Sequence, residues 1–197
     1  MTGAELDEAD ERREDVGRLI ASLAGGVARL GPGERALLRR PTFGAAPSPA
    51  ALGLTARLLT AAGAGEKDLT WARIGRFALL LRLMALLAGT REENQANPHR
   101  RGATLGQAYG DLLTGGGKRR PEEVDARLLM LVAAQGEVFD TLLERAIRRL
   151  AASGEGALDQ VELWRLIEWP GSERAGRARL AVARDFYRRA PHRPSAT

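Results

Sequence analysis

The stretch WARIGRFALLLRLMALLA, residues 71–88, decides the fold class of this chain of 197 residues. Its apolar residues recur every three or four positions, from Trp71 through Phe77 to Ala88, which is the period of an amphipathic α-helix. The three arginines of the stretch fall mostly off that apolar face. The pattern predicts a long helix that packs one face against a core.

The rest of the chain repeats this helical pattern between glycine and proline breaks. Leucine and alanine supply most of the apolar residues and favour helix over strand, while aromatic residues make up only 5% of the chain. We therefore expect an all-α fold, a helical bundle made of two small helical units. The expected units are residues 1–102 and 103–190, followed by a disordered tail at 191–197. The expected helices cover residues 16–30, 33–40, 49–62, 71–88, 104–113, 121–134, 137–152, 159–168 and 172–189.

Helix starts are marked by polar side chains that can accept hydrogen bonds from free backbone N–H groups. Thr70 and Ser172 are favourable N-cap residues for the helices that follow them. Asp159 and Glu162 show the spacing of a capping box, in which each side chain would bond to the backbone of the other residue. These residues predict where three of the helices begin.

Large side chains of the second half are expected to fill the core. Trp164 and Trp169, like Trp71 in the first half, are interpreted as core anchors because their large apolar area favours burial. The last helix is expected to turn Leu180, Ala183, Phe186 and Tyr187 inward.

Side chains that carry most enzyme chemistry are scarce in this sequence. The absence of cysteine excludes disulfides, cysteine-ligated metals and a thiol nucleophile. The two histidines, His99 and His192, both lie next to proline and have no second ligand at metal spacing. The run Gly115–Lys118 resembles a phosphate-binding loop, but Leu112 and Arg119 occupy the positions of a required glycine and a required hydroxyl residue. We therefore expect no enzyme activity, no cofactor and no metal site.

Charge is distributed unevenly along the chain. Residues 1–15 hold seven acids and two arginines, a net charge of −5, so the overall +5 leaves +10 for the remainder. This acidic start differs from the basic start of a signal peptide, and Arg82 interrupts the longest apolar stretch. We expect a cytoplasmic protein that does not associate with membranes.

Arginine supplies 28 of the 30 basic residues. Its planar guanidinium binds phosphate through two parallel hydrogen bonds, so an arginine-rich surface favours contact with a nucleic-acid backbone. A GC-rich genome also encodes arginine in place of lysine, so the number of arginines alone decides nothing. Their positions are more informative, because they cluster between Arg174 and Arg193, in loop-like stretches between Arg91 and Arg120, and on outer helix faces.

Six motifs follow one another along the chain. They are GERALLRR (33–40), TLGQA (104–108), DARLL (125–129) with LVAA (131–134), the 143–150 helix with Arg148-Arg149, the 158–169 segment, and ARDFY (183–187). In this order they resemble the CasB family, the small subunits of the type I-E CRISPR surveillance complex Cascade, and the resemblance spans roughly Asp15 to Arg189. Two features depart from the family pattern: Val182 precedes Ala183 where members often carry tryptophan, and the loop 115–120 is rich in glycine.

The resemblance implies a non-catalytic protein present as a head-to-tail homodimer within Cascade. It implies contacts with the backbone and large Cascade subunits, with crRNA and with target DNA, where basic surface helps to hold the strands of the R-loop. Exposed arginines with few free aromatic side chains suit contact with a strand backbone more than base stacking. The candidate nucleic-acid contacts are Arg39, Arg40, Arg100, Arg101, Lys118, Arg119, Arg120, Arg127, Arg145, Arg148 and Arg149.

Two other functions remain open from the sequence. A helical adaptor that joins proteins of a larger assembly would use its positive charge for solubility alone and would not contact nucleic acid. A helix-turn-helix regulator is the weaker alternative, because no short helix pair with a compact turn precedes a polar, base-reading helix.

Overall fold

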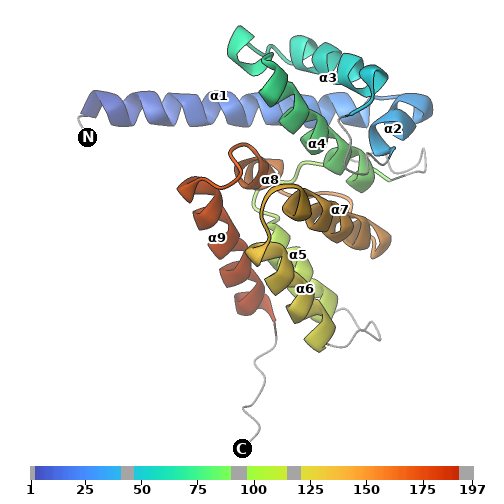
Figure 1. The fold of residues 1–197 in the computed structure, drawn as a ribbon, viewed down its shortest axis with the longest axis vertical. Coiled ribbons are helices and arrows are strands. Elements are labelled where there is room, and N and C mark those ends of the chain that lie inside the picture. Colours follow the sequence, from blue (N-terminus) through green and yellow to red (C-terminus); the bar gives the residue numbers. More distant parts are fainter. Residues whose placement is uncertain (1–2, 41–46, 90–96, 115–120, 191–197) are drawn as a thin grey trace, which may run out of the picture. The chain divides into compact units, whose positions relative to one another are not determined.

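The computed structural model describes residues 3–40, 47–89, 97–114 and 121–190. Over these residues the chain forms nine α-helices, one short 3-10 helix and no β-strand, which confirms the all-α prediction (Figure 1). None of the helices in the described ranges is long and apolar enough to span a membrane. The elements are α1 (Gly3–Ala28), α2 (Pro32–Arg39), α3 (Pro49–Ala61), η1 (Glu66–Asp68), α4 (Trp71–Leu87), α5 (Leu105–Thr114), α6 (Pro121–Ala133), α7 (Gly136–Ala152), α8 (Gln160–Ile167) and α9 (Glu173–Arg189).

Two compact units make up the chain, Met1–His99 and Arg100–Thr197. The first contains α1 to α4 and the second contains α5 to α9. The division lies three residues before the expected boundary after residue 102, so the segment that precedes α5 belongs to the second unit. The predicted tail at 191–197 and the candidate residues Lys118, Arg119 and Arg120 lie outside the described residues.

Helix α4 is the central helix of the first unit. It packs against α1, α2 and α3, and almost every residue from Phe77 to Ala88 is buried. Arg82 is also buried, although the arginines of this helix were expected to lie mostly outside the apolar face. The prediction of one buried face is therefore wrong for the second half of α4, because three helices surround it.

The second unit is built around the contact between α5 and α9. Gly106 and Gly110 lie one turn apart on α5 and face α9, Gly106 against the backbone at Val182 and Phe186 and Gly110 against Cβ and Cγ of Arg189. A side chain at either glycine would hold the two helices apart. α9 also packs against α8 and α6, and α6 packs against α7, so this contact lies at the centre of the unit.

The three tryptophans differ in burial. Trp164 is 1% exposed and anchors the core of the second unit, as predicted. The predictions for Trp71 and Trp169 are wrong, because these side chains are 75% and 52% exposed. Trp71 is the first residue of α4 and Trp169 follows the end of α8, so both lie at helix ends, outside the packed core.

Helix α9 buries a face that agrees with the expected one only in part: Phe186 is buried as predicted, and Ala183 is half-buried. Ala175, Arg179, Val182 and Phe186 form its inward stripe, whereas Leu180 and Tyr187 are exposed, contrary to the prediction. The guanidinium of Arg179 lies 4.4 Å from the centre of the Phe139 ring of α7. This cation–π contact allows an arginine to occupy a core position, which the apolar periodicity did not allow for.

Candidate nucleic-acid interface

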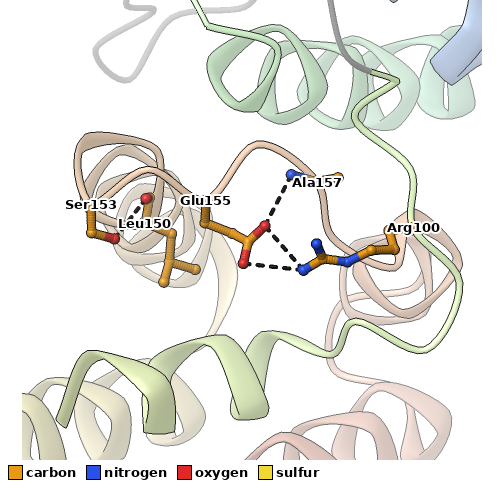
Figure 2. A network of polar contacts seen from close by, with 5 residues as sticks. All are labelled: Arg100, Leu150, Ser153, Glu155 and Ala157. Carbon is orange, nitrogen blue, oxygen red and sulfur yellow. Dashed lines mark hydrogen bonds and ion pairs between the residues drawn. The ribbon is translucent and has the colours of Figure 1, made fainter. Parts of the chain in front are cut away.

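The C-terminal end of α7 is closed by a regular hydrogen-bond arrangement. Gly154 has φ +96°, a left-handed conformation that glycine adopts without steric cost. The chain therefore turns back, and the N–H of Glu155 donates to the carbonyl of Leu150 at 3.0 Å, as in a Schellman motif. The hydroxyl of Ser153 donates to the same carbonyl at 2.8 Å (Figure 2). This hydrogen-bonded turn fixes the backbone position of Glu155.

Glu155 connects the end of α7 to the segment that precedes α5. Its carboxylate accepts hydrogen bonds from Nη2 of Arg100 at 3.1 and 3.2 Å and from the N–H of Ala157 at 3.2 Å (Figure 2). The backbone N–H of Arg100 donates to the carbonyl of Leu158 at 3.0 Å. Arg100 is therefore held beside the end of α7 through both its backbone and its side chain.

Two carboxylates hold the residues after Arg100. Asp159 accepts from the N–H groups of Val161 and Glu162, which confirms it as the N-cap of α8, and its other oxygen accepts from the N–H of Gly102 at 2.9 Å. Glu162 does not complete the predicted capping box, because its Oε2 accepts from the N–H of Leu105 at 2.7 Å instead. The polar contacts thus fasten the start of α5 to the start of α8.

Burial raises the pKa of Glu162 to about 7, and the nearby carboxylates of Asp159 and Asp185 act in the same direction. The hydrogen bond from Leu105 opposes that shift because it favours the charged form. Glu162 is therefore a group of the second unit whose charge changes near neutral pH.

Three candidate arginines lie on one outer face of α7, since Arg145, Arg148 and Arg149 are three and four residues apart. Arg145 and Arg148 are exposed and Arg149 is half-buried. Arg148 donates from Nε to Glu144 at 2.9 Å, an ion pair one helical turn long. Such surface pairs are weak and leave the guanidinium close to solvent.

Arg101 follows Arg100 directly and is also exposed. Together, helix α7 and the segment that precedes α5 place five of the candidate arginines at or near the C-terminal half of α7. We refer to this set as the α7-end patch. It consists of Arg100, Arg101, Arg145, Arg148 and Arg149.

The other described candidates lie elsewhere. Arg39 donates from Nε to the carbonyl of Ala85 at 2.7 Å and from Nη2 to the carbonyl of Gly89, so its guanidinium binds the C-terminal end of α4. Arg40 is exposed at the end of α2. Arg127 is exposed on α6, with Nη2 3.8 Å from the carboxylate of Glu123.

Several exposed arginines of α9 were not among the candidates, although the sequence shows that arginine is frequent there. They are Arg174, Arg177, Arg184, Arg188 and Arg189. The periodicity placed Leu180 and Tyr187 in the core, although both lie on the exposed side of α9 with several of these arginines. Within the described ranges, no group of three or more histidine or acidic side chains is arranged to hold a metal ion.

The chain is similar to a known protein family over most of its length. The sequence profile of the family described as CRISPR-associated protein Cse2 matches residues 34–187, which is most of the chain. The chain belongs to the Cse2 family. Cse2 is another name for CasB, so the resemblance indicated by the sequence motifs is confirmed. Membership of the Cse2 family supports the role of a subunit of the CRISPR Cascade complex.

The fold agrees with a solved structure of a Cse2 protein. The crystal structure of CasB from Thermobifida fusca matches 88% of this chain and 98% of its own, with a TM-score of 0.63 and 21% sequence identity. At this identity the match establishes a shared fold. Among curated proteins, no sequence matches this chain.

Proposed function

We propose that this Cse2 protein is a non-catalytic, nucleic-acid-binding subunit of Cascade that stabilises the crRNA-guided R-loop in antiviral defence. In this role it contacts the backbone and large Cascade subunits, crRNA and the DNA strands, and it acts as a homodimer within the complex. The observation that carries the proposal is the α7-end patch, because contacts within the second unit bring Arg100 to the end of the helix that bears Arg148 and Arg149.

The chemistry of the α7-end patch suits a phosphate backbone. Guanidinium groups bind phosphate oxygens in a bidentate manner and remain charged at any physiological pH. Contacts to phosphate position a strand without reading its sequence, which fits a complex in which base pairing to a guide RNA supplies specificity. Arg40 and Arg127 are proposed as additional contacts, and Arg39 as a contact that would have to exchange its bonds to the end of α4.

The proposal is tested by measuring how salt affects DNA binding by the full chain. Fluorescein-labelled single-stranded DNA is titrated between 50 and 200 mM salt (roughly the range over which phosphate contacts weaken), and log K is plotted against log salt. Each phosphate contact on a single strand contributes about 0.7 to the slope. The variant Arg145→Gln/Arg148→Gln/Arg149→Gln is therefore expected to lower the slope by about 2 if all three arginines bind phosphate.

A matched control separates the α7-end patch from overall charge. Arg18, Arg29 and Arg57 are exposed residues of the first unit, and changing all three to glutamine removes the same charge. We expect that variant to bind nearly as the unchanged protein does. If instead the α7 variant binds DNA normally and still co-purifies with the other Cascade subunits, the chain functions as a protein–protein adaptor and the proposal is wrong.

A further inference from the structure

The outer face of α9 carries a line of exposed side chains that the proposed function does not use. Arg177, Leu180, Arg184 and Arg188 follow one another at intervals of three or four residues, and Tyr187 lies three residues after Arg184. All five are exposed, and the line extends about 16 Å along the helix at 1.5 Å per residue. We refer to these five residues as the α9 face.

Tyr187 presents a ring that is both exposed and fixed. Its side chain is 46% exposed, while its hydroxyl donates to Oδ1 of Asp125 on α6 at 2.7 Å. The ring also packs edge-to-face on the buried ring of Phe186, with centroids 5.1 Å apart and planes inclined at 73°. The hydrogen bond to Asp125 raises the pKa of the phenol, so the ring stays neutral. A planar apolar surface is thus held in place at the surface.

Two arginines lie to one side of this ring on the helix surface: Arg184 is three residues before Tyr187, and Arg188 is the next residue and lies one turn from Arg184. Arg184 donates from Nε to Oδ1 of Asp185 at 3.1 Å, and its Nη2 lies 3.1 Å from the same oxygen, which leaves its Nη1 donors for another acceptor. Arg188 forms no ion pair within the described part of the chain. The acids bonded to Tyr187 and Arg184 are Asp125, which holds the phenol, and Asp185, which engages one edge of the guanidinium.

We propose that the α9 face binds single-stranded nucleic acid, with an unpaired base stacked on Tyr187 and neighbouring phosphates bound by Arg184 and Arg188. The inference rests on the proposed function and extends it to a second surface. Bases in a duplex already stack on one another, so a fixed ring beside a row of cations favours an unpaired strand. An acidic peptide would satisfy the arginines but would not need a fixed ring.

The test compares three probes for the full chain carrying Tyr187→Leu. The probes are oligothymidine, an abasic strand of the same length and a duplex. Loss of one stacked base is expected to weaken oligothymidine binding by roughly 5- to 100-fold, and to leave the other two affinities unchanged. Tyr187→Phe is the matched control, because it keeps the ring but loses the bond to Asp125, and we expect it to bind within about twofold of the unchanged protein.

Direct contact is measured on the unchanged protein, so that folding of a variant does not enter. A strand containing 5-iodouracil is irradiated on the full chain, and the cross-linked peptide is identified by mass spectrometry. We expect the cross-link at Tyr187. Cross-links found only elsewhere, or polyglutamate competing as strongly as oligothymidine, would overturn the inference.

The outcomes separate this inference from the proposed function. Normal oligothymidine binding by Tyr187→Leu, together with weakened binding by the α7-end variant, overturns the α9 face alone. An equal loss for all three probes excludes base stacking and also overturns it. Absence of any DNA binding by the unchanged protein overturns both proposals.

Discussion

Replacing Gly106 by alanine tests the close contact between α5 and α9 on which the second unit depends. An added Cβ at this position would lie closer than 3.0 Å to the carbonyl oxygen of Val182 and 2.9 Å from the backbone nitrogen of Phe186. Both atoms belong to the backbone of α9, so neither can move away by a side-chain rotation. The two helices would have to separate.

The size of the effect follows from two opposing terms. Ordinary contact begins at 3.4 Å, so the distance to Phe186 is short by 0.5 Å and the distance to Val182 by more. Overpacking of this kind costs typically about 1–3 kcal/mol, and alanine recovers about 0.5–1 kcal/mol through its higher helix propensity. Because the clash involves backbone, we expect the free energy of unfolding of the second unit to fall by about 2 kcal/mol.

Gly176, in the first turns of α9, provides the control. A Cβ there would meet no atom within 4 Å, so Gly176→Ala is expected to stabilise the unit by about 0.5–1 kcal/mol. Urea denaturation is followed by tryptophan fluorescence in a Trp71→Phe background, where the two remaining tryptophans, Trp164 and Trp169, both report the second unit. If Gly106→Ala matched the control in stability, the close approach of α5 and α9 would be refuted.

Three further predictions concern the second unit and the exposed tryptophan of the first. Because folding raises the pKa of Glu162 from 4.5 to about 7, the contribution of this residue to stability is complete below pH 4.5 and is lost as pH rises through 7. Glu162→Gln should therefore flatten the pH dependence of the free energy of unfolding, by up to about 3 kcal/mol between pH 5 and 8. Parallel curves for the two proteins would contradict this. Asp159→Ala removes the cap of α8 and the bond to Gly102, and should cost about 1–2 kcal/mol in urea denaturation, whereas Asp159→Asn should recover most of the loss. Trp164→Ala should cost about 3–5 kcal/mol, whereas Trp71→Ala should change the free energy of unfolding by no more than about 0.5 kcal/mol; comparable losses would show that Trp71 is buried after all.

The helices were predictable because their apolar periods and breaks are local properties of the sequence. What periodicity missed is how many neighbours each helix has and which polar residues the core accepts. Nothing within α4 indicates that three helices surround it. In α9, Phe186 was recognised as a core residue, but the buried guanidinium of Arg179 is stabilised by the ring of Phe139, forty residues away, and could not be recognised from α9 alone.

The candidate arginines also divide into those whose position follows from local spacing and those whose position depends on tertiary contacts. Arg145, Arg148 and Arg149 were recognisable as one face because their spacing alone places them together on a helix. The position of Arg100 was not predictable, since it depends on Glu155, and Glu155 depends in turn on the backbone turn at Gly154. Arg39 shows the opposite outcome: it was predicted as a nucleic-acid contact, but its guanidinium donates to the carbonyl of Ala85 in α4 and to that of Gly89 just after the helix.

The two proposed surfaces differ in the chemistry they offer to a strand. The α7-end patch consists of arginines alone, so its affinity should depend on salt and be nearly indifferent to whether bases are paired. The α9 face adds a fixed aromatic ring beside two arginines, so only its contribution should depend on unpaired bases. A subunit that stabilises an R-loop must favour separated strands over the duplex they would re-form, and charge alone does not make that distinction. In the two proposals taken together, the α7-end patch supplies affinity that depends on salt, and Tyr187 supplies the preference for an open strand.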